Sequence, residues 1–285
     1  MYGCKLCMGT NEQFGIPVTR QIQLFRQAGF EGVFTEWSEG EDIAAYRQAA
    51  DEAGIRYIGI HAPFGNAAKM WEPPKAARPA VEELLACLQD CEKYGVPVMI
   101  VHAYIGFADA HPLTYGLENF RPVVEAAGRA GVRIALENTE GEIYLERLMT
   151  GLTEYDNVGF CWDSGHEMCY NRGQDMLGKY GGRLFFTHLN DNLGIRDYGG
   201  AITPLDDLHL LPFDGIADWQ DIARRLARQG LDDYLTFELN TESKPGRHEN
   251  DKYANMPIEA YIAEAYARAC RVAALFLQQK AAGKA

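Results

Sequence analysis

The chain has 285 residues and a formal net charge of −13, with 47% hydrophobic and 24% charged residues. This balance is typical of an ordinary globular protein with enough apolar surface for a full core. The acidic excess argues against nucleic acid as a partner, because duplex binding depends on Lys and Arg side chains that neutralise phosphates. The length allows two domains or one large one, and an α/β barrel of about 250 residues is commonly a single domain.

The seven cysteines are an odd number, scattered from Cys4 to Cys270, which does not suit a disulfide framework and favours a reducing cytoplasm. Cys4 and Cys7 form a C-x-x-C within the first predicted strand. Because no second pair follows at zinc spacing, we interpret them as small buried residues. No basic N-terminal region precedes an apolar segment, and no run of about eighteen apolar residues occurs. The sequence therefore predicts neither a standard secretion signal nor a membrane span.

A repeated helix-ending signal divides the chain. A glycine follows a helical stretch and precedes an apolar run at five places, Gly29, Gly54, Gly95, Gly131 and Gly230. Helices commonly end at a residue in the left-handed conformation, which glycine adopts without a side-chain penalty. Each position therefore predicts the end of a helix and the start of a buried strand.

Apolar runs without polar alternation are typical of parallel strands that are covered on both faces. Eight such runs occur, at residues 5–10, 32–37, 55–61, 96–102, 132–138, 157–163, 183–190 and 234–240. Helical periodicity separates them. Asp218 is a predicted N-cap, and Pro257 is the predicted first residue of the last helix.

Eight strands that alternate with helices predict an α/β fold with a parallel sheet, and eight units indicate closure into a (βα)8 TIM barrel. An open, doubly wound sheet is the alternative. Neither G-x-G-x-x-G after the first strand nor G-x-x-x-x-G-K-[ST] is present, so the usual nucleotide signatures of that alternative are missing. Without a linker or a composition break, we expect one domain over residues 1–285, with a flexible tail after about residue 278.

Titratable residues recur where the predicted strands end, and in a barrel these ends open onto one face. His166 follows Asp163 by three residues, and this pair by itself favours helix capping or a satisfied turn over metal binding. Burial of so many carboxylates without cations would be costly, so their recurrence favours a metal site. The strand-end residues are His61, His102, Glu137, Asp163, His188 and Glu238, with Glu36 near the end of the second strand and Asp207 and His209 in the loop after the seventh.

Two kinds of ligand are present in this set. One subset is rich in carboxylates and suits manganese, magnesium or cobalt, whereas the histidine-rich subset suits zinc, and the set could hold more than one ion. The first subset is Glu137, Asp163, His188 and Glu238, and the second is His61, His102 and His209. His111 and His248 lie outside the pattern, and we interpret them as surface residues. Trp37, Phe64, Tyr104 and Trp162 are candidates for an apolar wall or for core positions.

Five segments carry a resemblance to a known family. They are ALEN with Glu137, WDSGH with Asp163 and His166, THLND with His188, the H-x-x-P-F-D-G-x-x-D-W stretch that begins at His209, and FELN with Glu238. Through them the whole chain resembles the xylose-isomerase-like barrel superfamily of sugar phosphate isomerases and epimerases, which also includes the endonuclease IV-type apurinic endonucleases. Dimers and tetramers would be in keeping with this resemblance, and the sequence leaves the oligomeric state open.

The resemblance implies two metal arrangements. In the isomerase and epimerase members the counterparts of Glu137, Asp163, His188 and Glu238 hold one divalent cation, the two glutamates form the acid/base pair, and the counterpart of His166 contacts substrate. In the endonuclease branch a trinuclear zinc cluster has counterparts, in the same order, of His61, His102, Glu137, Asp163, His166, His188, Asp207, His209 and Glu238. The acidic balance and the isolation of Lys69 and Arg196 argue against a DNA substrate.

We therefore expect a divalent-metal-dependent isomerase or epimerase of a small sugar, sugar phosphate or polyol-derived ketose. Glu137 and Glu238 would transfer a proton through a metal-stabilised enediolate, and His166, Trp37 and Phe64 would bind the substrate. The alternatives are a zinc-dependent phosphoesterase of the endonuclease IV type and a non-catalytic sugar-binding barrel. The loops at 62–74, 103–114 and 190–213 carry no motif that identifies the sugar.

Overall fold

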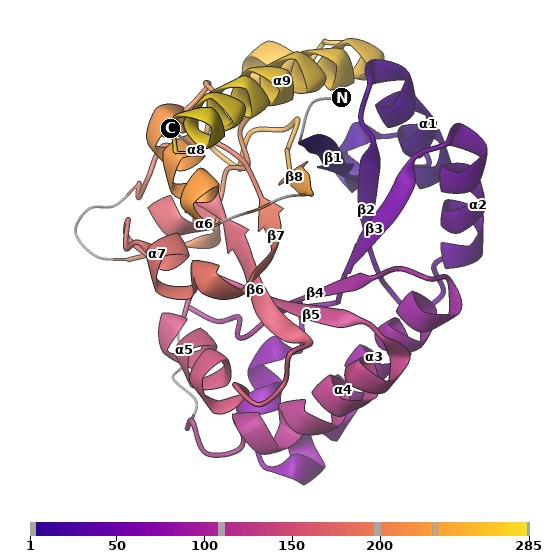
Figure 1. Ribbon diagram of the computed structural model, residues 1–285, viewed down its shortest axis with the longest axis vertical. Coiled ribbons are helices and arrows are strands. Elements are labelled where there is room, and N and C mark those ends of the chain that lie inside the picture. Colours follow the sequence, from indigo (N-terminus) through magenta and orange to yellow (C-terminus); the bar gives the residue numbers. More distant parts are fainter. Residues whose placement is uncertain (1–3, 108–111, 197–200, 230, 232, 284–285) are drawn as a thin grey trace.

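The computed structural model describes residues 4–107, 112–196, 201–229, 231 and 233–283. Within them, eight parallel strands form a nearly closed barrel inside a layer of helices (Figure 1). The strands are β1 (Lys5–Gly9), β2 (Gly32–Glu36), β3 (Arg56–His61), β4 (Val98–His102), β5 (Arg133–Glu137), β6 (Val158–Asp163), β7 (Leu184–His188) and β8 (Tyr234–Phe237). Each lies inside the range that its apolar run predicts, and the (βα)8 barrel is confirmed.

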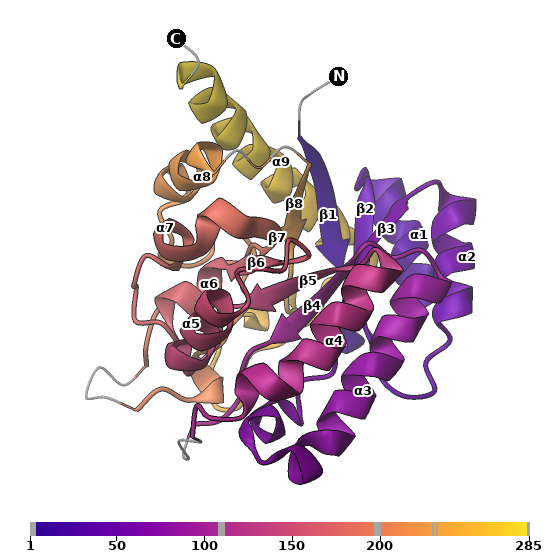
Figure 2. The ribbon, with the colours of Figure 1, turned by 60° about the horizontal axis from the view of Figure 1, so that its bottom comes forward.

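Helices cover the outside of the barrel, and α3 and α4 lie side by side on one flank (Figure 2). The described α-helices are α1 (Val18–Ala28), α2 (Ile43–Ala53), α3 (Pro74–Lys93), α4 (Gly116–Ala130), α5 (Glu142–Gly151), α6 (Ser164–Met168), α7 (Met176–Tyr180), α8 (Trp219–Arg228) and α9 (Ile258–Ala282). Short 3-10 helices occupy Glu12–Phe14, Ala67–Trp71, Gly181–Arg183, Pro204–Asp206 and Asp251–Tyr253.

The seam between β7 and β8 closes the barrel. The strands are hydrogen-bonded in the order β7-β6-β5-β4-β3-β2-β1-β8, and a parallel bridge pairs Leu189 with Phe237. At the seam, the Thr187 amide donates to Thr236 Oγ1 at 3.2 Å, and the Thr236 amide donates to Thr187 Oγ1 at 3.1 Å. Two threonine hydroxyls thus replace part of the backbone ladder, and the open-sheet alternative is wrong.

Apolar side chains are buried on both faces of the strands. A larger outer cluster, which includes Met8, Val33 and Leu136, packs between the strands and the helices. The inward-facing residues fill the barrel with Cys7, Phe34, Ile58, Val98, Ile100, Ala135, Cys161, Phe186 and Tyr234. Because successive side chains of a strand point to opposite faces, a strand that is covered on both sides has no polar alternation. This burial explains why continuous apolar runs identified the strands.

The helix ends follow the predicted signals closely. The glycines at positions 29, 54, 95 and 131 have positive φ angles, and Gly230 lies outside the described residues. The Asp218 carboxylate caps α8 by accepting from the Gln220 and Asp221 amides at 3.0 Å each. Pro257 is the N-cap of α9 and not its first residue. Helix α9 continues to Ala282, so residues 279–282 are helical.

The seven cysteines are all free thiols. Cys7 is buried in the barrel interior, as predicted, whereas Cys4 is only partly buried. Among the described residues, no helix combines the length and the hydropathy that a bilayer crossing requires.

The threonine seam makes a testable contribution to stability. Thr236→Val is expected to lower the free energy of unfolding by about 1–3 kcal/mol, because it leaves the buried Thr187 amide without its acceptor. Urea unfolding followed by circular dichroism measures the change. Thr150→Val is the matched control, since the exposed Thr150 hydroxyl bonds only carbonyls of its own helix. An unchanged free energy of unfolding for Thr236→Val would contradict this role of the seam.

Candidate metal centre

Strands β3 to β7 each end in a titratable residue at the same end of the barrel. These last residues are His61, His102, Glu137, Asp163 and His188, and Glu238 directly follows β8. The strand register places His102 beside Glu137 and Asp163 beside His188. The predicted convergence of these residues is therefore present.

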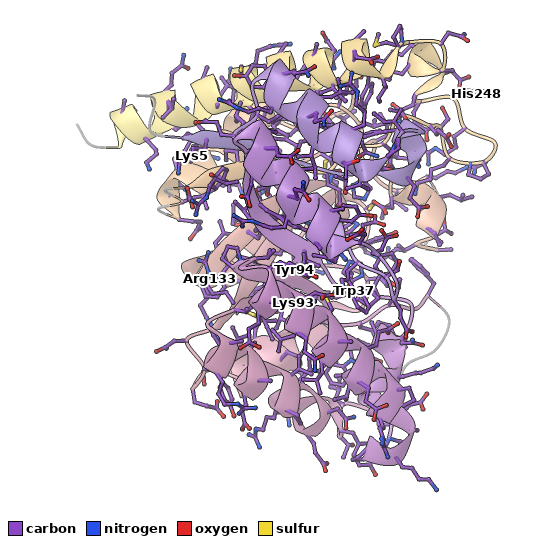
Figure 3. The ribbon with its side chains drawn as sticks, turned by 90° about the vertical axis from the view of Figure 1, so that its right-hand side faces the viewer. Lys5, Trp37, Lys93, Tyr94, Arg133 and His248 are labelled. Atoms are coloured by element: carbon purple, nitrogen blue, oxygen red, sulfur yellow. The ribbon has the colours of Figure 1, made fainter. Side chains whose placement is uncertain are left out.

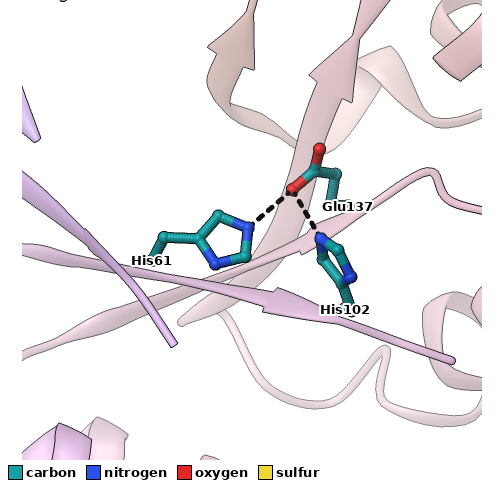
Figure 4. Close-up of side chains that lie close together, drawn as sticks. All are labelled: His61, His102 and Glu137. Atoms are coloured by element: carbon teal, nitrogen blue, oxygen red, sulfur yellow. Dashed lines mark hydrogen bonds and ion pairs between the residues drawn. The ribbon is translucent and has the colours of Figure 1, made fainter. Parts of the chain in front are cut away.

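Glu137 lies at the centre of the cluster and is completely buried. Its Oε2 atom is 3.3 Å from His61 Nε2 and 3.4 Å from His102 Nε2 (Figure 4). Its Oε1 atom is 3.1 Å from His188 Nδ1 and 3.2 Å from His166 Nδ1. One carboxylate therefore contacts four imidazoles that come from four separate segments of the chain.

The carboxylate-rich subset forms a compact group of possible ligands. One ligand atom each from Glu137, Asp163, His188 and Glu238 lies within 4.8 Å of all the others. His188 Nδ1 is 3.1 Å from Glu137 Oε1 and 3.2 Å from Glu238 Oε2, so it faces both glutamates. Oxygen ligands with one imidazole suit a hard or intermediate divalent cation. Three carboxylates this close would repel one another without positive charge between them, so the donor set fits such a cation.

Three further groups share residues with this subset, and one of them joins Cys161, which the sequence did not single out as a ligand, to Glu137 and His188. His61, His102 and Glu137 form another group, and Asp163, His166 and His209 form the last, each with ligand atoms within 4.8 Å of one another. Asp207 adjoins the last group, because its Oδ1 atom is 2.8 Å from His209 Nε2 and 3.2 Å from His166 Nε2. All nine candidate ligands from the sequence are thus brought into one continuous cluster.

Buried amide side chains hold Asp163, and the sequence analysis missed them. Asn190 Nδ2 donates to Asp163 Oδ2 at 2.9 Å, and the His166 amide donates to Asp163 Oδ1 at 2.6 Å. Asn138 brackets the Asp163 backbone, with its Oδ1 accepting from the amide and its Nδ2 donating to the carbonyl. A Cβ atom on Gly165 would lie 1.9 Å from Asn190 Oδ1, so a larger residue there would displace the Asn190 side chain from its position beside Asp163. Their positions in the sequence could have identified them, because Asn138 and Asn190 closely follow the strand-end candidates Glu137 and His188.

The segment that carries Asp207 and His209 is organised by Asp191. This buried carboxylate accepts from the Phe213 amide at 2.9 Å, the Ala217 amide at 3.0 Å and the Trp219 indole at 2.8 Å. A backbone bridge between Asp191 and Leu210 lies directly beside His209. The P-F-D-G-x-x-D-W stretch therefore acts as an anchor that holds the loop ligands against the strand ends.

The buried carboxylates of the cluster are stable in their ionised form only when positive charge lies beside them. Burial raises the pKa of Asp163 to about 6, with Glu137 and Glu238 acting in the same direction against His166 and His209. Burial also opposes ionisation of Glu238, but His188 and His209 lower its pKa to about 2. The pKa of Glu137 is held well below its usual range despite burial, because His188 and the other imidazoles surround it. Imidazolium groups or a bound cation would supply this charge.

The aromatic candidates separate into two groups. Phe64 is 40% exposed, and its ring stacks on His102 with the ring centroids 4.7 Å apart, so it lies at the cluster. Trp37 is buried, and its indole donates to Asp90 Oδ2 at 2.7 Å. Tyr104 stacks on the Tyr144 ring, and the Trp162 indole donates to Glu167. The contacts of Tyr104 and Trp162 are those of packing residues.

Glu36 and Trp37 line a separate cavity of about 350 Å³ beside the cluster, at the ends of β1 and β2. Partial desolvation in the cavity wall raises the pKa of Glu36, although the residue is exposed at its surface; His61 opposes this shift and Glu238 adds to it. The remaining histidines lie elsewhere. The His248 side chain is 84% exposed, which confirms its surface position, and His111 lies outside the described residues.

The fold and the cluster together define a (βα)8 barrel with a candidate metal centre at the C-terminal ends of its strands. A family model described as xylose isomerase-like TIM barrel matches residues 22–265. The chain belongs to this family.

Individual relatives and solved structures are similar to the chain over most of its length. The uncharacterized protein y4fM of Sinorhizobium fredii (strain NBRC 101917 / NGR234) is 28% identical over 262 residues, which cover 78% of this chain and 80% of the relative. The IOLI protein with a bound zinc atom superposes with a TM-score of 0.73 at 18% identity, over 95% of this chain and 99% of its own. D-psicose 3-epimerase with D-tagatose from Clostridium cellulolyticum H10 gives a TM-score of 0.70 at 16% identity, over 95% and 99%.

A longer protein contains the same fold as one part. A fusion of a xylose isomerase-like TIM barrel with 4-hydroxyphenylpyruvate dioxygenase gives a TM-score of 0.64 at 15% identity. The match covers 88% of this chain but only 41% of the fusion protein.

The contact between His209 and Asp207 predicts a pH dependence of the metal-free protein. Burial opposes protonation of His209, but Asp207 and Glu238 raise its pKa to about 9. Protonated His209 therefore stabilises the folded protein, and this contribution is complete below about pH 6.5, the pKa of an unperturbed histidine. The contribution is lost as the pH rises through about 9. In EDTA, the free energy of unfolding should therefore fall between pH 6.5 and 9.5, and His209→Gln should remove up to about 3 kcal/mol of that fall.

Urea unfolding at the two pH values measures this difference. His248→Gln is the matched control, because His248 is exposed and pairs with Asp251 on the surface. If His209→Gln and wild type lost the same stability over this interval, His209 would not carry the effect.

Proposed function

We propose that the protein is a divalent-metal-dependent isomerase or epimerase of a small sugar, sugar phosphate or polyol-derived ketose. The observation that carries this proposal is the convergence of three carboxylates and one imidazole at four strand ends, within 4.8 Å of one another. These residues are Glu137, Asp163, His188 and Glu238. The D-psicose 3-epimerase among the structures with the same fold supports a sugar as the substrate class.

A divalent cation held by these four residues would polarise a substrate carbonyl and stabilise the negative charge that develops when the adjacent carbon loses a proton. Glu137 at the end of β5 and Glu238 after β8 flank the other two residues of the set along the barrel rim. Both are ionised at neutral pH, because neighbouring histidines hold the pKa of each well below its usual range, so either can accept a proton.

The two glutamates divide the proton transfer between them in this proposal. One removes the carbon-bound proton. The other returns a proton to the opposite face of the same carbon, which inverts the centre, or to the neighbouring carbon, which moves the carbonyl group. Asp163 and His188 stay in place because Asn190 and the strand register hold them.

Three residues are proposed to orient the substrate. His166 Nδ1 faces Glu137, and His166 Nε2 faces Asp207. In this proposal a substrate hydroxyl takes the place of the Asp207 carboxylate beside His166 Nε2. Phe64 presents an exposed ring above His102, which suits the apolar face of a sugar. Trp37 forms part of the neighbouring cavity wall, where the far end of a longer substrate would lie.

A zinc-dependent phosphoesterase of the endonuclease IV type is the second candidate. One observation favours it, namely the two further ligand groups around His61 and His209, which would allow more than one ion. Two or three zinc ions could activate a water molecule and stabilise the leaving oxygen of a phosphodiester. The acidic balance of the chain, with a net charge of −13, makes a small phosphoester a better substrate than DNA.

Loss of either glutamate carboxylate tests the isomerase proposal. Glu137→Gln and Glu238→Gln are each expected to lower kcat by at least about 100-fold, because each removes a proton-transfer group. The assay is interconversion of D-fructose, D-psicose, D-tagatose and L-ribulose, and of their phosphates, in the presence of manganese. Glu146→Gln is the matched control, since Glu146 is a half-exposed helix residue that pairs with Lys179. A panel without any interconversion by wild type, or full activity in Glu137→Gln, would overturn the proposal.

Metal content separates the two candidate functions. The protein as purified is expected to contain about one manganese, cobalt or magnesium ion per chain, and EDTA should abolish sugar interconversion until that metal is restored. Elemental analysis by mass spectrometry measures the stoichiometry. Two or three zinc ions per chain, together with hydrolysis of bis(p-nitrophenyl) phosphate, would instead support the phosphoesterase.

A further inference from the structure

The opposite end of the barrel contains a larger cavity that the proposed function does not use. It has a volume of about 660 Å³ and opens at the N-terminal ends of the strands. Figure 3 shows Lys5 and Arg133 at this end of the molecule, whereas Trp37 and His248 lie toward the end that carries the candidate metal centre. The cavity is therefore remote from the histidine cluster.

Strand alternation places basic side chains in the mouth of this cavity. Lys5, Arg56 and Arg133 are the first residues of β1, β3 and β5. The residues two positions further along these strands belong to the barrel interior, namely Cys7, Ile58 and Ala135. Because residues two apart on a strand point to the same face, the three cations face the barrel axis and line the cavity. Arg26, near the end of α1, adds a fourth cation to the lining.

Three of these cations have no salt-bridge partner among the described residues, although Arg56 lies near enough to Asp51 to help lower the pKa of that carboxyl. Within the described residues, the guanidinium groups of Arg26, Arg56 and Arg133 form no ion pair or hydrogen bond, although Arg133 lies over the Phe185 ring at 5.1 Å. Lys5 pairs with Asp233 at 3.1 Å. Two carboxylates, Glu31 and Asp233, line the cavity against the four cations. An excess of positive charge in one concave site is unexpected in a chain with a net charge of −13.

The floor of the cavity is apolar and aromatic. Ile58, Val98, Phe186 and Tyr234 line it, and each is buried as part of the barrel interior. Small-molecule sites in this size range commonly combine apolar and aromatic walls with a few polar groups that fix orientation. Guanidinium groups recognise carboxylate, sulfonate or phosphate oxygens through paired hydrogen bonds.

We propose that this N-terminal mouth is a second ligand site, which binds an aromatic organic anion. Arg56 and Arg133 hold the anionic group, and the aromatic body lies against Phe185 and the apolar floor. The proposal is independent of the chemistry at the metal centre. Bound anion would also relieve the repulsion among three inward-facing cations, so occupancy should stabilise the fold.

Fluorescence titration with 8-anilinonaphthalene-1-sulfonate tests the proposal, with calorimetry to count the sites. Wild type is expected to bind about one probe per chain. The double variant Arg56→Gln/Arg133→Gln should bind the probe at least about tenfold more weakly, because it loses charge-assisted hydrogen bonds. The uncharged N-phenyl-1-naphthylamine should bind both proteins alike. Higher salt should weaken binding of the sulfonate more strongly in wild type than in the double variant, which retains Lys5 and Arg26 in the lining.

Two controls locate the binding. Arg47→Gln/Arg78→Gln removes two exposed cations that pair within their own helices, and it should leave the titration unchanged. Phe64→Ala, at the metal-centre end, should also leave it unchanged. Arg133→Lys retains the positive charge but loses the planar guanidinium that can form two parallel hydrogen bonds to the anion, so its affinity should lie between those of wild type and the double variant. This conservative variant keeps the proposal testable if the double variant does not fold. Equal sulfonate binding by wild type, Arg133→Lys and the double variant, or no saturable binding by wild type, would overturn the proposal.

Discussion

The buried carboxylate of Glu137 is the constraint on which the candidate site depends. A fully buried carboxylate is stable only with compensating charge and hydrogen bonds, and here four imidazoles provide them. Three of the imidazoles belong to β3, β4 and β7, and the fourth follows β6. The contacts exist only if these strands keep their register and the barrel closes. The fold and the site are therefore coupled through one side chain.

A second layer of polar residues makes the cluster rigid. Asn138 and Asn190 hold Asp163, and Asp191 holds the loop that carries Asp207 and His209. Outer partners of this kind set the orientation of ligand side chains and their affinity for metal. None of these three residues is a candidate ligand itself. Their burial shows that residues packed into the barrel wall hold the candidate site.

The two ends of the barrel differ in charge. Histidines and carboxylates gather at the C-terminal strand ends, whereas inward-facing Lys5, Arg56 and Arg133 line the N-terminal mouth. The apolar interior, which includes Phe34, separates the two ends. The same strand alternation points side chains from both mouths toward the barrel axis, and the cost of burying a polar group without a partner keeps most of the middle apolar.

The sequence by itself determined the strands and the residues at their ends. Burial on both faces leaves a local signature, a continuous apolar run, and six of the nine candidate ligands stand at the ends of such runs. The other three, His166, Asp207 and His209, lie in the segments that follow two of these runs, and the resemblance to the endonuclease branch includes them in one ligand set. Only the tertiary structure decided which atoms meet, because the Glu137 contacts join residues between 29 and 76 positions apart and depend on register and closure.

The tertiary structure also separated residues that look alike in the sequence. Phe64 lies on His102, whereas Trp162 packs against Glu167, although both aromatic residues lie close to a strand end. The sequence could not distinguish them, because the direction of a side chain near a strand end depends on strand pairing and on the loop that follows. The role of Asn190 and the group of cations at the N-terminal mouth were also identified only from the structure. Each depends on neighbours that are distant along the chain.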